Sequence, residues 1–471
     1  MMKKIKVNKL ICFSLFCCLL FLSTANVHAE EEITLEEAIA WGLDQSYSLS
    51  EYKDHLEQIE RKLTKIKASL NWQADLTGNL AADNQGGSPV MVTPEQESAE
   101  LEVGLQGSKV YLWGMSIGPK LSLKKKLSGE KTDPETEFSF NLTQKLYPWA
   151  PSTEKQEYYT TLHSLKKAQD NLEWQVESKK IDWLEGYFNL LHLQEQVKVA
   201  EEQYRLVKND FNLALQREKI GEAGKQQVLA EQVKLKQAEY NLKQVKNSFI
   251  EEEAKWYLEL GLPAGKKVQL QEENIYFQQI KEELETFVTD WNDADQLMMM
   301  VTQNHYQLAA NQLDQEELRQ KWEWKRVERK PEVTTGGTYN YPDQQWKLNL
   351  NVNYKFLDGG AKKLEDQDYQ AQLSSLEREH ENLIGSLEIQ LKKLLSQVEL
   401  ADLQVEEKDI QYQKAFLEKE VYRKQLEEGL ITEKDWEEKS LAYKTAEINI
   451  KNARNKVFLS RLRVLHFIGM I

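Results

Sequence analysis

The sequence has no cysteine beyond residue 18, and it contains little proline or glycine. Its three cysteines, Cys12, Cys17 and Cys18, all lie near the start of a 471-residue chain. If that first segment is removed, no disulfide, thiol nucleophile or thiolate metal site can form. Nine prolines and 21 glycines, beside 29% charged residues, suit long solvated helices better than an α/β enzyme.

Long apolar runs are missing as well, apart from one short run at residues 10–22. Four lysines precede that run and Val27-His28-Ala29 follows it, which predicts a secretory signal over residues 1–29. A membrane anchor is the alternative, and the shortness of the run disfavours it. Removing these residues takes away four lysines and no acid, so the net charge falls from −15 to −19. Such a surface does not favour nucleic acid, and an exported chain without apolar helices could enter a membrane only through strands.

The rest of the chain is written twice. Residues 138–146 and 348–356 both alternate apolar and polar side chains, with Gln144 the one exception, and a long charged helical pattern follows each. Each pattern breaks at a glycine, Gly221 or Gly429. Such a duplication indicates one shared, pseudo-symmetric object. We therefore divide the chain into a signal (1–29), a first repeat (30–262), a linker (263–292) and a second repeat (293–471).

Both repeats contain the same elements in the same order. The first has helices over 34–72, a strand region over 74–147, a long helix over 152–219 and a return helix over 226–260. The second has helices from 293, strands over 331–356, a long helix over 361–427 and a return helix over 433–466. Apolar residues spaced by three and four define a heptad seam on each long helix. The seam residues are Leu190, Leu193, Val197, Ala200, Tyr204, Val207, Phe211 and Ala214, and then Leu391, Leu394, Val398, Ala401, Val405, Lys408, Tyr412 and Ala415, of which Lys408 is the one that is not apolar.

The strands show one apolar and one polar face over about ten residues, which is typical of membrane barrel strands. A soluble sheet packed on helices gives the same alternation, so the strands alone do not separate the two. A sheet in lipid must close, and four strands per chain, or even six, are too few. Three chains with four strands each would supply twelve, so the membrane interpretation requires an oligomer. The expected lipid-facing residues are Phe138, Phe140, Leu142, Leu348, Leu350, Val352 and Tyr354.

The helices fit the same construction. A helix of about 65 residues is about 100 Å long and must pack laterally on neighbours. Narrow apolar seams on otherwise polar helices predict a tube, with bulk water outside and a wet lumen inside. A solid coiled-coil stalk without a channel is the alternative.

Several segments resemble the TolC-like outer membrane factors. They are the strand-to-helix junction at 356–363, the tip Gly429-Leu430-Ile431-Thr432 followed by Asp435, the close at 260–262 and the opening at 33–39. The resemblance covers essentially all of the chain after the signal. It implies a mainly α fold with β strands, in which duplicated helix-strand-strand-helix repeats form a trimeric outer-membrane β-barrel continued by a long periplasmic α-helical coiled-coil barrel.

The first repeat departs from this pattern. Its junction, residues 146–151, lacks the paired glycines, and its tip has Gln227 in the place of Asp435. The first repeat also carries an insertion that we expect to form an extra hairpin around 99–127, and whether this hairpin adds barrel strands stays open at this point.

The two tips are the candidate docking and pore-rim sites. Their residues are Gly221, Gly224, Lys225, Gln227, Gly429, Thr432 and Asp435. Thr432 and Asp435 have the spacing of a capping box, which is a complete structural explanation. A functional role is the alternative: the glycines would let a partner approach, and a ring of Asp435 carboxylates would bind cations or narrow the pore.

No catalytic, cofactor or metal site is expected, since the seven histidines show no ligand spacing and charge runs on helices are usually solvated. We predict a passive, non-enzymatic exit duct of an efflux pump or type I secretion system. The expected partners are two further copies, a periplasmic adaptor, an inner-membrane transporter and outer-membrane lipid. The alternative is a periplasmic coiled-coil adaptor or scaffold without a channel.

Overall fold

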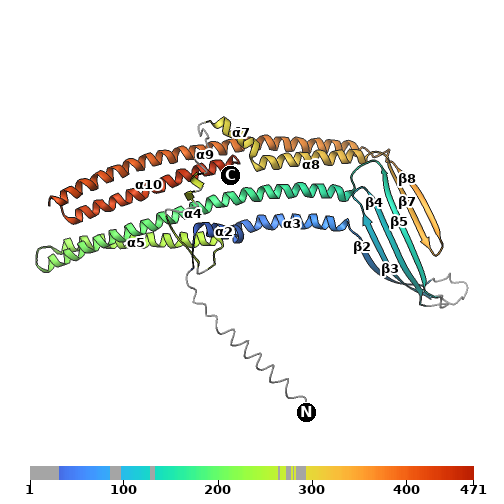
Figure 1. Ribbon diagram of the computed structural model, residues 1–471, viewed down its shortest axis with the longest axis horizontal. Coiled ribbons are helices and arrows are strands. Elements are labelled where there is room, and N and C mark those ends of the chain that lie inside the picture. Colours follow the sequence, from blue (N-terminus) through green and yellow to red (C-terminus); the bar gives the residue numbers. More distant parts are fainter. Residues whose placement is uncertain are drawn as a thin grey trace, which may run out of the picture.

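The computed structural model describes residues 31–84, 97–127, 133–263, 266–271, 277, 278, 280–282 and 293–471 (Figure 1). The predicted signal and most of the predicted linker lie outside these residues. Long helices run from a sheet at one end of the molecule to two tight connections between helices at the other, and the carboxyl terminus lies near the middle (Figure 1).

Each repeat contributes two short and two long helices. Those of the first repeat are α2 (Leu35–Gln45), α3 (Tyr47–Ser69), α4 (Thr153–Lys219) and α5 (Lys225–Leu260). Those of the second are α7 (Ala294–Asn304), α8 (Tyr306–Glu328), α9 (Ala361–Glu427) and α10 (Glu433–Phe467). Both α4 and α9 have 67 residues, which corresponds to about 100 Å at 1.5 Å per residue.

The helix ends follow ordinary capping chemistry. The Thr34 side chain caps α2 in a capping box with Glu37. Ser152 caps α4 through its hydroxyl, which accepts a hydrogen bond from the Lys155 N–H. Both long helices end before a glycine with positive φ, Gly221 at 80° and Gly429 at 73°. The chain can reverse there because glycine adopts this backbone conformation without a Cβ clash.

The helices lie side by side in one layer (Figure 1). In the half away from the sheet, α5 packs on α4, α4 on α10, and α10 on α9. In the half next to the sheet, the order is α3, α4, α8 and α9. The heptad seams lie on the inward sides of α4 and α9, where Leu190, Ala200, Leu391 and Val398 are buried.

Two apolar cores lie at the middle of the molecule, one formed mainly by the first repeat, with Phe458, Leu459 and Leu462 of α10, and one by the second. In the first, Trp256 donates its indole N–H to the Trp183 carbonyl at 2.9 Å, and both rings are buried. A Cβ on Gly186 would lie 2.3 Å from the Trp256 ring, so only glycine fits there. A short parallel pair, β1 (Glu31–Ile33) and β6 (Lys266–Val268), borders this core. The second core contains Leu297, Val301, Leu308, Leu387, Leu391, Val464, Leu465 and Ile468.

Six antiparallel strands form one sheet, in the order β2-β3-β4-β5-β7-β8. They are β2 (Gln73–Asn84), β3 (Glu97–Val110), β4 (Met115–Lys126), β5 (Glu135–Tyr147), β7 (Glu332–Tyr341) and β8 (Gln345–Asn353). The sheet therefore has six strands per chain, and the question of whether the hairpin at 99–127 adds strands is answered. The extra hairpin at 99–127 pairs with its neighbours on both sides and joins the same sheet as β3 and β4.

None of the described helices offers an apolar stretch of membrane-spanning length.

Candidate functional site

One face of the six-stranded sheet is apolar across its whole width. The strand register sets Leu76, Leu105, Leu121, Phe138 and Tyr341 in one row, each beside the next. These side chains are exposed, and Leu76 keeps 76% of its surface accessible. A soluble domain rarely leaves so wide an apolar surface uncovered, so this face indicates a contact with lipid or protein.

The predicted lipid-facing residues lie on this face, with one exception. A second row runs through Ile117, Leu142, Gly337 and Leu348. Phe138 and Phe140 of β5 and Leu350 and Val352 of β8 extend the same face. The strand expected to run to residue 356 ends at Asn353, so Tyr354 lies beyond β8. That residue is exposed in the segment leading to α9.

The opposite face is polar and carries paired charges. On β8 it presents Asn349 and Asn351, which alternate with Leu348 and Leu350. Across strands, Lys124 lies 2.8 Å from the Glu137 carboxylate. Such pairs leave little net charge, and polar groups of this kind remain stable only where water reaches them.

Exposed aromatic rings gather at both ends of the sheet. At the helical end, Trp113 lies in the β3–β4 turn and Trp149 follows β5, and both are exposed. At the far end, Tyr341 and Trp346 flank the β7–β8 turn. The 13 residues of β5 span about 43 Å, or about 30 Å when tilted by about 45°, which matches the hydrocarbon thickness of a bilayer. Aromatic girdles of this spacing are typical of membrane strands.

The sheet has two open edges. Strands β2 and β8 stand at its ends, and within the described ranges neither pairs with a further strand. Unpaired backbone groups cost several kcal/mol each in hydrocarbon. A membrane location therefore requires strands from other chains.

The helical layer also has open edges, and sequence reasoning missed them. A second apolar stripe on α9, the outer stripe, consists of Leu400, Leu403, Ile410, Leu417 and Val421. All five are exposed, and their spacings of 3, 7, 7 and 4 residues are those of a heptad. At the other edge, α5 exposes Leu229, Val233, Tyr240 and Ile250, also at heptad spacings. The sequence signal was present, but charged residues interleave with both stripes.

At the second tip, the predicted capping box is formed. The Thr432 hydroxyl accepts a hydrogen bond from the Asp435 N–H at 3.3 Å, and the Thr432 N–H donates to the Asp435 carboxylate at 3.0 Å. The Thr432 hydroxyl also donates to that carboxylate at 2.7 Å. These bonds hold the pKa of Asp435 below its usual range, the hydroxyl first and the backbone N–H second. A further role of Asp435 in binding cations stays a prediction.

The first tip is built differently. Gly224 occupies the N-cap position of α5 and provides no side-chain hydrogen bond. Lys225 and Gln227 begin the helix with exposed side chains. Gln227 therefore does not reproduce the cap that Asp435 forms, and the two tips present different chemistry at equivalent positions.

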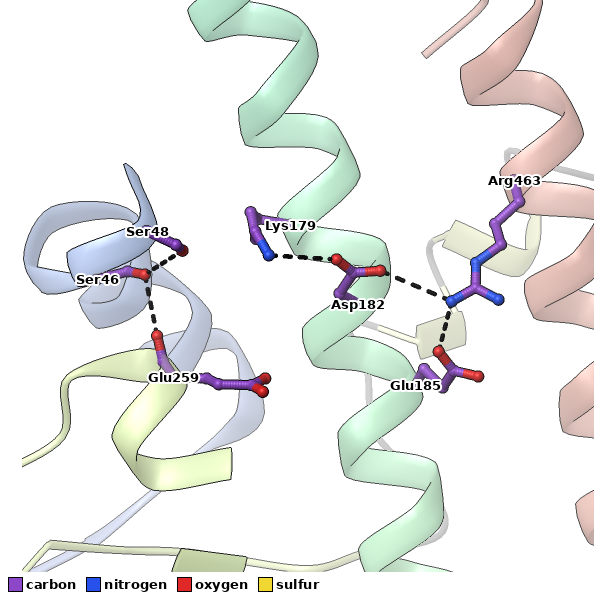
Figure 2. A network of polar contacts seen from close by, with 7 residues as sticks. All are labelled: Ser46, Ser48, Lys179, Asp182, Glu185, Glu259 and Arg463. Carbon is purple, nitrogen blue, oxygen red and sulfur yellow. Dashed lines mark hydrogen bonds and ion pairs between the residues drawn. The ribbon is translucent and has the colours of Figure 1, made fainter. Parts of the chain in front are cut away.

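Polar contacts join the two repeats at the middle of the molecule. Figure 2 shows Arg463 of α10 reaching two carboxylates of α4, Asp182 at 3.6 Å and Glu185 at 2.5 Å. Lys179 contacts the other side of Asp182 (Figure 2). The network links a helix of the second repeat to one of the first, so it sets how the two halves meet.

We searched for side chains that could together bind a metal ion. Throughout the part of the chain that the structure describes, no group of three His, Cys, Asp or Glu side chains could hold one. The expectation of no catalytic or cofactor site stays a prediction.

No protein-family model matches the sequence, and no curated protein matches it either. Solved structures do match. The outer membrane channel CmeC of Campylobacter jejuni aligns with a TM-score of 0.64 at 13% identity, over 92% of this chain and 85% of that one. The outer membrane protein VceC of Vibrio cholerae gives 0.60 at 11%, over 92% and 96%. The open-state channel MtrE of Neisseria gonorrhoeae gives 0.60 at 12%, over 92% and 88%.

This chain has the fold of these outer membrane channels. This likeness confirms the predicted fold class, which is mainly helical with strands in duplicated repeats. Identities near 12% carry the fold alone, so activity and partners do not follow from the likeness.

Proposed function

We propose that this protein is a passive, non-enzymatic outer-membrane channel that serves as the exit duct of an efflux pump or type I secretion system. The observation that carries the proposal is the sheet: one face is apolar and exposed across six strands, and the other is polar. A sheet of this kind satisfies both lipid and an aqueous lumen when it closes.

Three copies complete the structure in this proposal. Each chain supplies six strands, so a homotrimer has eighteen, which is within the range of channel-forming barrels. The exposed stripes on α5 and α9 lie at opposite edges of the helical layer. The outer stripe of one chain can then pack on the α5 stripe of the next. Such a head-to-tail contact closes into a ring when the rotation allows it.

The helices would continue from the barrel into the periplasm as a tube. Its far rim consists of the tips at Gly221 and Gly429, where we place the contact with a periplasmic adaptor that leads to an inner-membrane transporter. The exposed Ile220 and Leu430 beside these glycines support a protein contact, because isolated apolar side chains at a polar tip have no internal partner. Cation binding by an Asp435 ring belongs to the same proposal.

Purified protein in detergent tests the proposal directly. We expect an oligomer that migrates faster on a gel before heating than after, and stepwise conductance in planar bilayers. Asp435→Ala should change the block of that conductance by divalent cations, with Gln227→Ala as the matched control at the first tip. A monomer that stays soluble without detergent and forms no pores would refute the channel, whereas unchanged block would remove only the carboxylate ring.

A further inference from the structure

Two histidines that are far apart in the sequence meet on one tryptophan at the middle of the molecule. The Trp174 ring of α4 lies 4.5 Å from the His305 ring and 4.1 Å from the His466 ring, centroid to centroid. His305 precedes α8, and His466 lies in the last turn of α10. Both imidazoles are buried, with 3% and 8% of their surface exposed. We call Trp174, His305 and His466 the histidine joint.

Each imidazole is held in a defined role. His305 Nδ1 accepts a hydrogen bond from the Gln307 N–H at 3.4 Å and thereby caps α8. A proton on Nδ1 would remove that acceptor. His466 Nε2 lies 3.0 Å from the Trp174 carbonyl, to which it donates. The His305 cap therefore requires a neutral ring, whereas the His466 hydrogen bond forms with a neutral or a protonated ring.

The joint connects elements of both repeats. Trp174 belongs to the first repeat, whereas His305 and His466 belong to the second and lie 161 positions apart. The equivalent break of the first repeat, before α3, has Ser46 in place of His305. The Ser46 hydroxyl donates to the Glu259 carbonyl of α5 at 2.9 Å (Figure 2). Serine does not titrate, so only the second repeat carries ionisable groups at this position.

The charged groups around the joint come from three helices. On α4, Glu177 and Asp182 raise the pKa of His466, and Asp182 is also bound to Arg463 of α10. On α9, Lys393 lines a cavity of about 420 Å³ that His305 and His466 also line. Tyr306 of α8 stacks on His305 at 5.3 Å.

We infer that the histidine joint is an acid-sensitive clasp between the two repeats, closed when both imidazoles are neutral and released when they are protonated. Protonation places two like charges against one buried indole and removes the α8 cap. The indole face attracts a single cation, but burial of two charges opposes their formation.

The pKa shifts of the two histidines agree with this geometry. Burial lowers the pKa of His305 to about 4, with a smaller contribution from the neighbouring His466. Burial also lowers the pKa of His466, against the opposing effect of the Trp174 carbonyl, Glu177 and Asp182. A histidine with a depressed pKa stabilises the folded joint above about pH 6.5, and this stability is lost as the pH falls from 6.5 toward 4.

Hydrogen exchange of the full chain in detergent, at pH 7.5 and 4.5 and corrected for intrinsic rates, tests the clasp. We expect protection of the first turn of α8 and the last turn of α10 to fall roughly tenfold or more at pH 4.5, while the middle of α9 stays protected. The double variant His305→Ser and His466→Gln should lose this pH dependence. His163→Gln, a partly buried histidine of α4, is the control and should retain it.

The wild-type protein alone decides the matter if the double variant does not fold. Unchanged protection of the joint at pH 4.5 would overturn the inference, and so would an equal loss of protection in all helices. The measurement needs no conductance, so the channel can fail its own test without affecting this one.

Discussion

A charge placed on the apolar sheet face tests the membrane contact most directly, and Leu348→Arg is the substitution of choice. Leu348 lies in one row with Leu142, close to the middle of β5, so it stands near the mid-height of the sheet. It keeps 72% of its surface exposed within the chain, so the substitution removes little internal contact. An effect of the substitution must therefore come from what covers this face.

The expected magnitude follows from the position. An arginine on the lipid face of a barrel costs about 2–4 kcal/mol near the bilayer midplane. Three copies in a trimer would cost about 6–12 kcal/mol if the contributions add. That is comparable to the whole stability of a typical folded domain, about 5–15 kcal/mol. We expect the variant to insert into vesicles poorly or not at all.

Asn349→Arg is the matched control, since it is the next residue and lies on the polar face. Its cross-strand neighbours are Gly336 and, beyond it, Thr143, so the new side chain meets no like charge on them. We expect this variant to insert as the wild-type chain does. The assay is refolding into phosphatidylcholine vesicles, with the folded fraction read from heat-modifiable gel migration.

Equal insertion of both arginine variants would refute the reasoning, because the two faces would then meet the same medium. Equal failure of both would refute it as well. The expected result is a large difference between two neighbouring positions, which only alternation between lipid and water produces.

Three further predictions concern the helices. Leu391→Ala opens a cavity in the second core and should lower the free energy of unfolding by about 2–5 kcal/mol; a change below 1 kcal/mol in urea titration would contradict the packing. Thr432→Ala removes the α10 cap and should destabilise the start of this helix by roughly 1 kcal/mol, seen as faster hydrogen exchange in its first turn; unchanged exchange would show that the cap does not stabilise the helix. Ile410→Lys in the outer stripe should weaken the proposed trimer in analytical ultracentrifugation, whereas Gln411→Lys should not; equal sedimentation of the two would exclude this stripe from the interface.

Much of the helical architecture was predictable because its determinants are local. The heptad spacing placed α4 and α9 over nearly the ranges observed, since a 3-4 repeat holds its phase over many turns. The tip glycines and the Thr432 cap were equally predictable, because each depends on residues a few positions apart. The alternation in β5 and β8 gave the two faces for the same reason.

The parts that were missed depend on contacts between distant segments. The strand number stayed open because β3 and β4 belong to the sheet only through their pairing with β2 and β5. The ends of β8 were misplaced because apolar alternation continues through Tyr354 after the pairing stops. The histidine joint was invisible because α8 and α10 bring together residues 161 positions apart, which no local spacing encodes.

Three structural differences between the two repeats lie at the sheet, at the midpoint of the molecule and at the tip. Helices α4 and α9 have the same length, and both end before a glycine with positive φ. The differences fall on the sheet, where one repeat adds a hairpin; on the midpoint, where Ser46 is replaced by His305; and on the tip, where Gly224 is replaced by Thr432. A ring of three copies contains six repeats, in which first and second repeats alternate. Each difference would then occur in three of the six repeats, with one unaltered repeat between them. An acid-sensitive joint in one repeat would then release alternate helical hairpins while the others keep the tube closed around its axis. A duplicated scaffold thus permits partial opening, which six identical repeats could not provide.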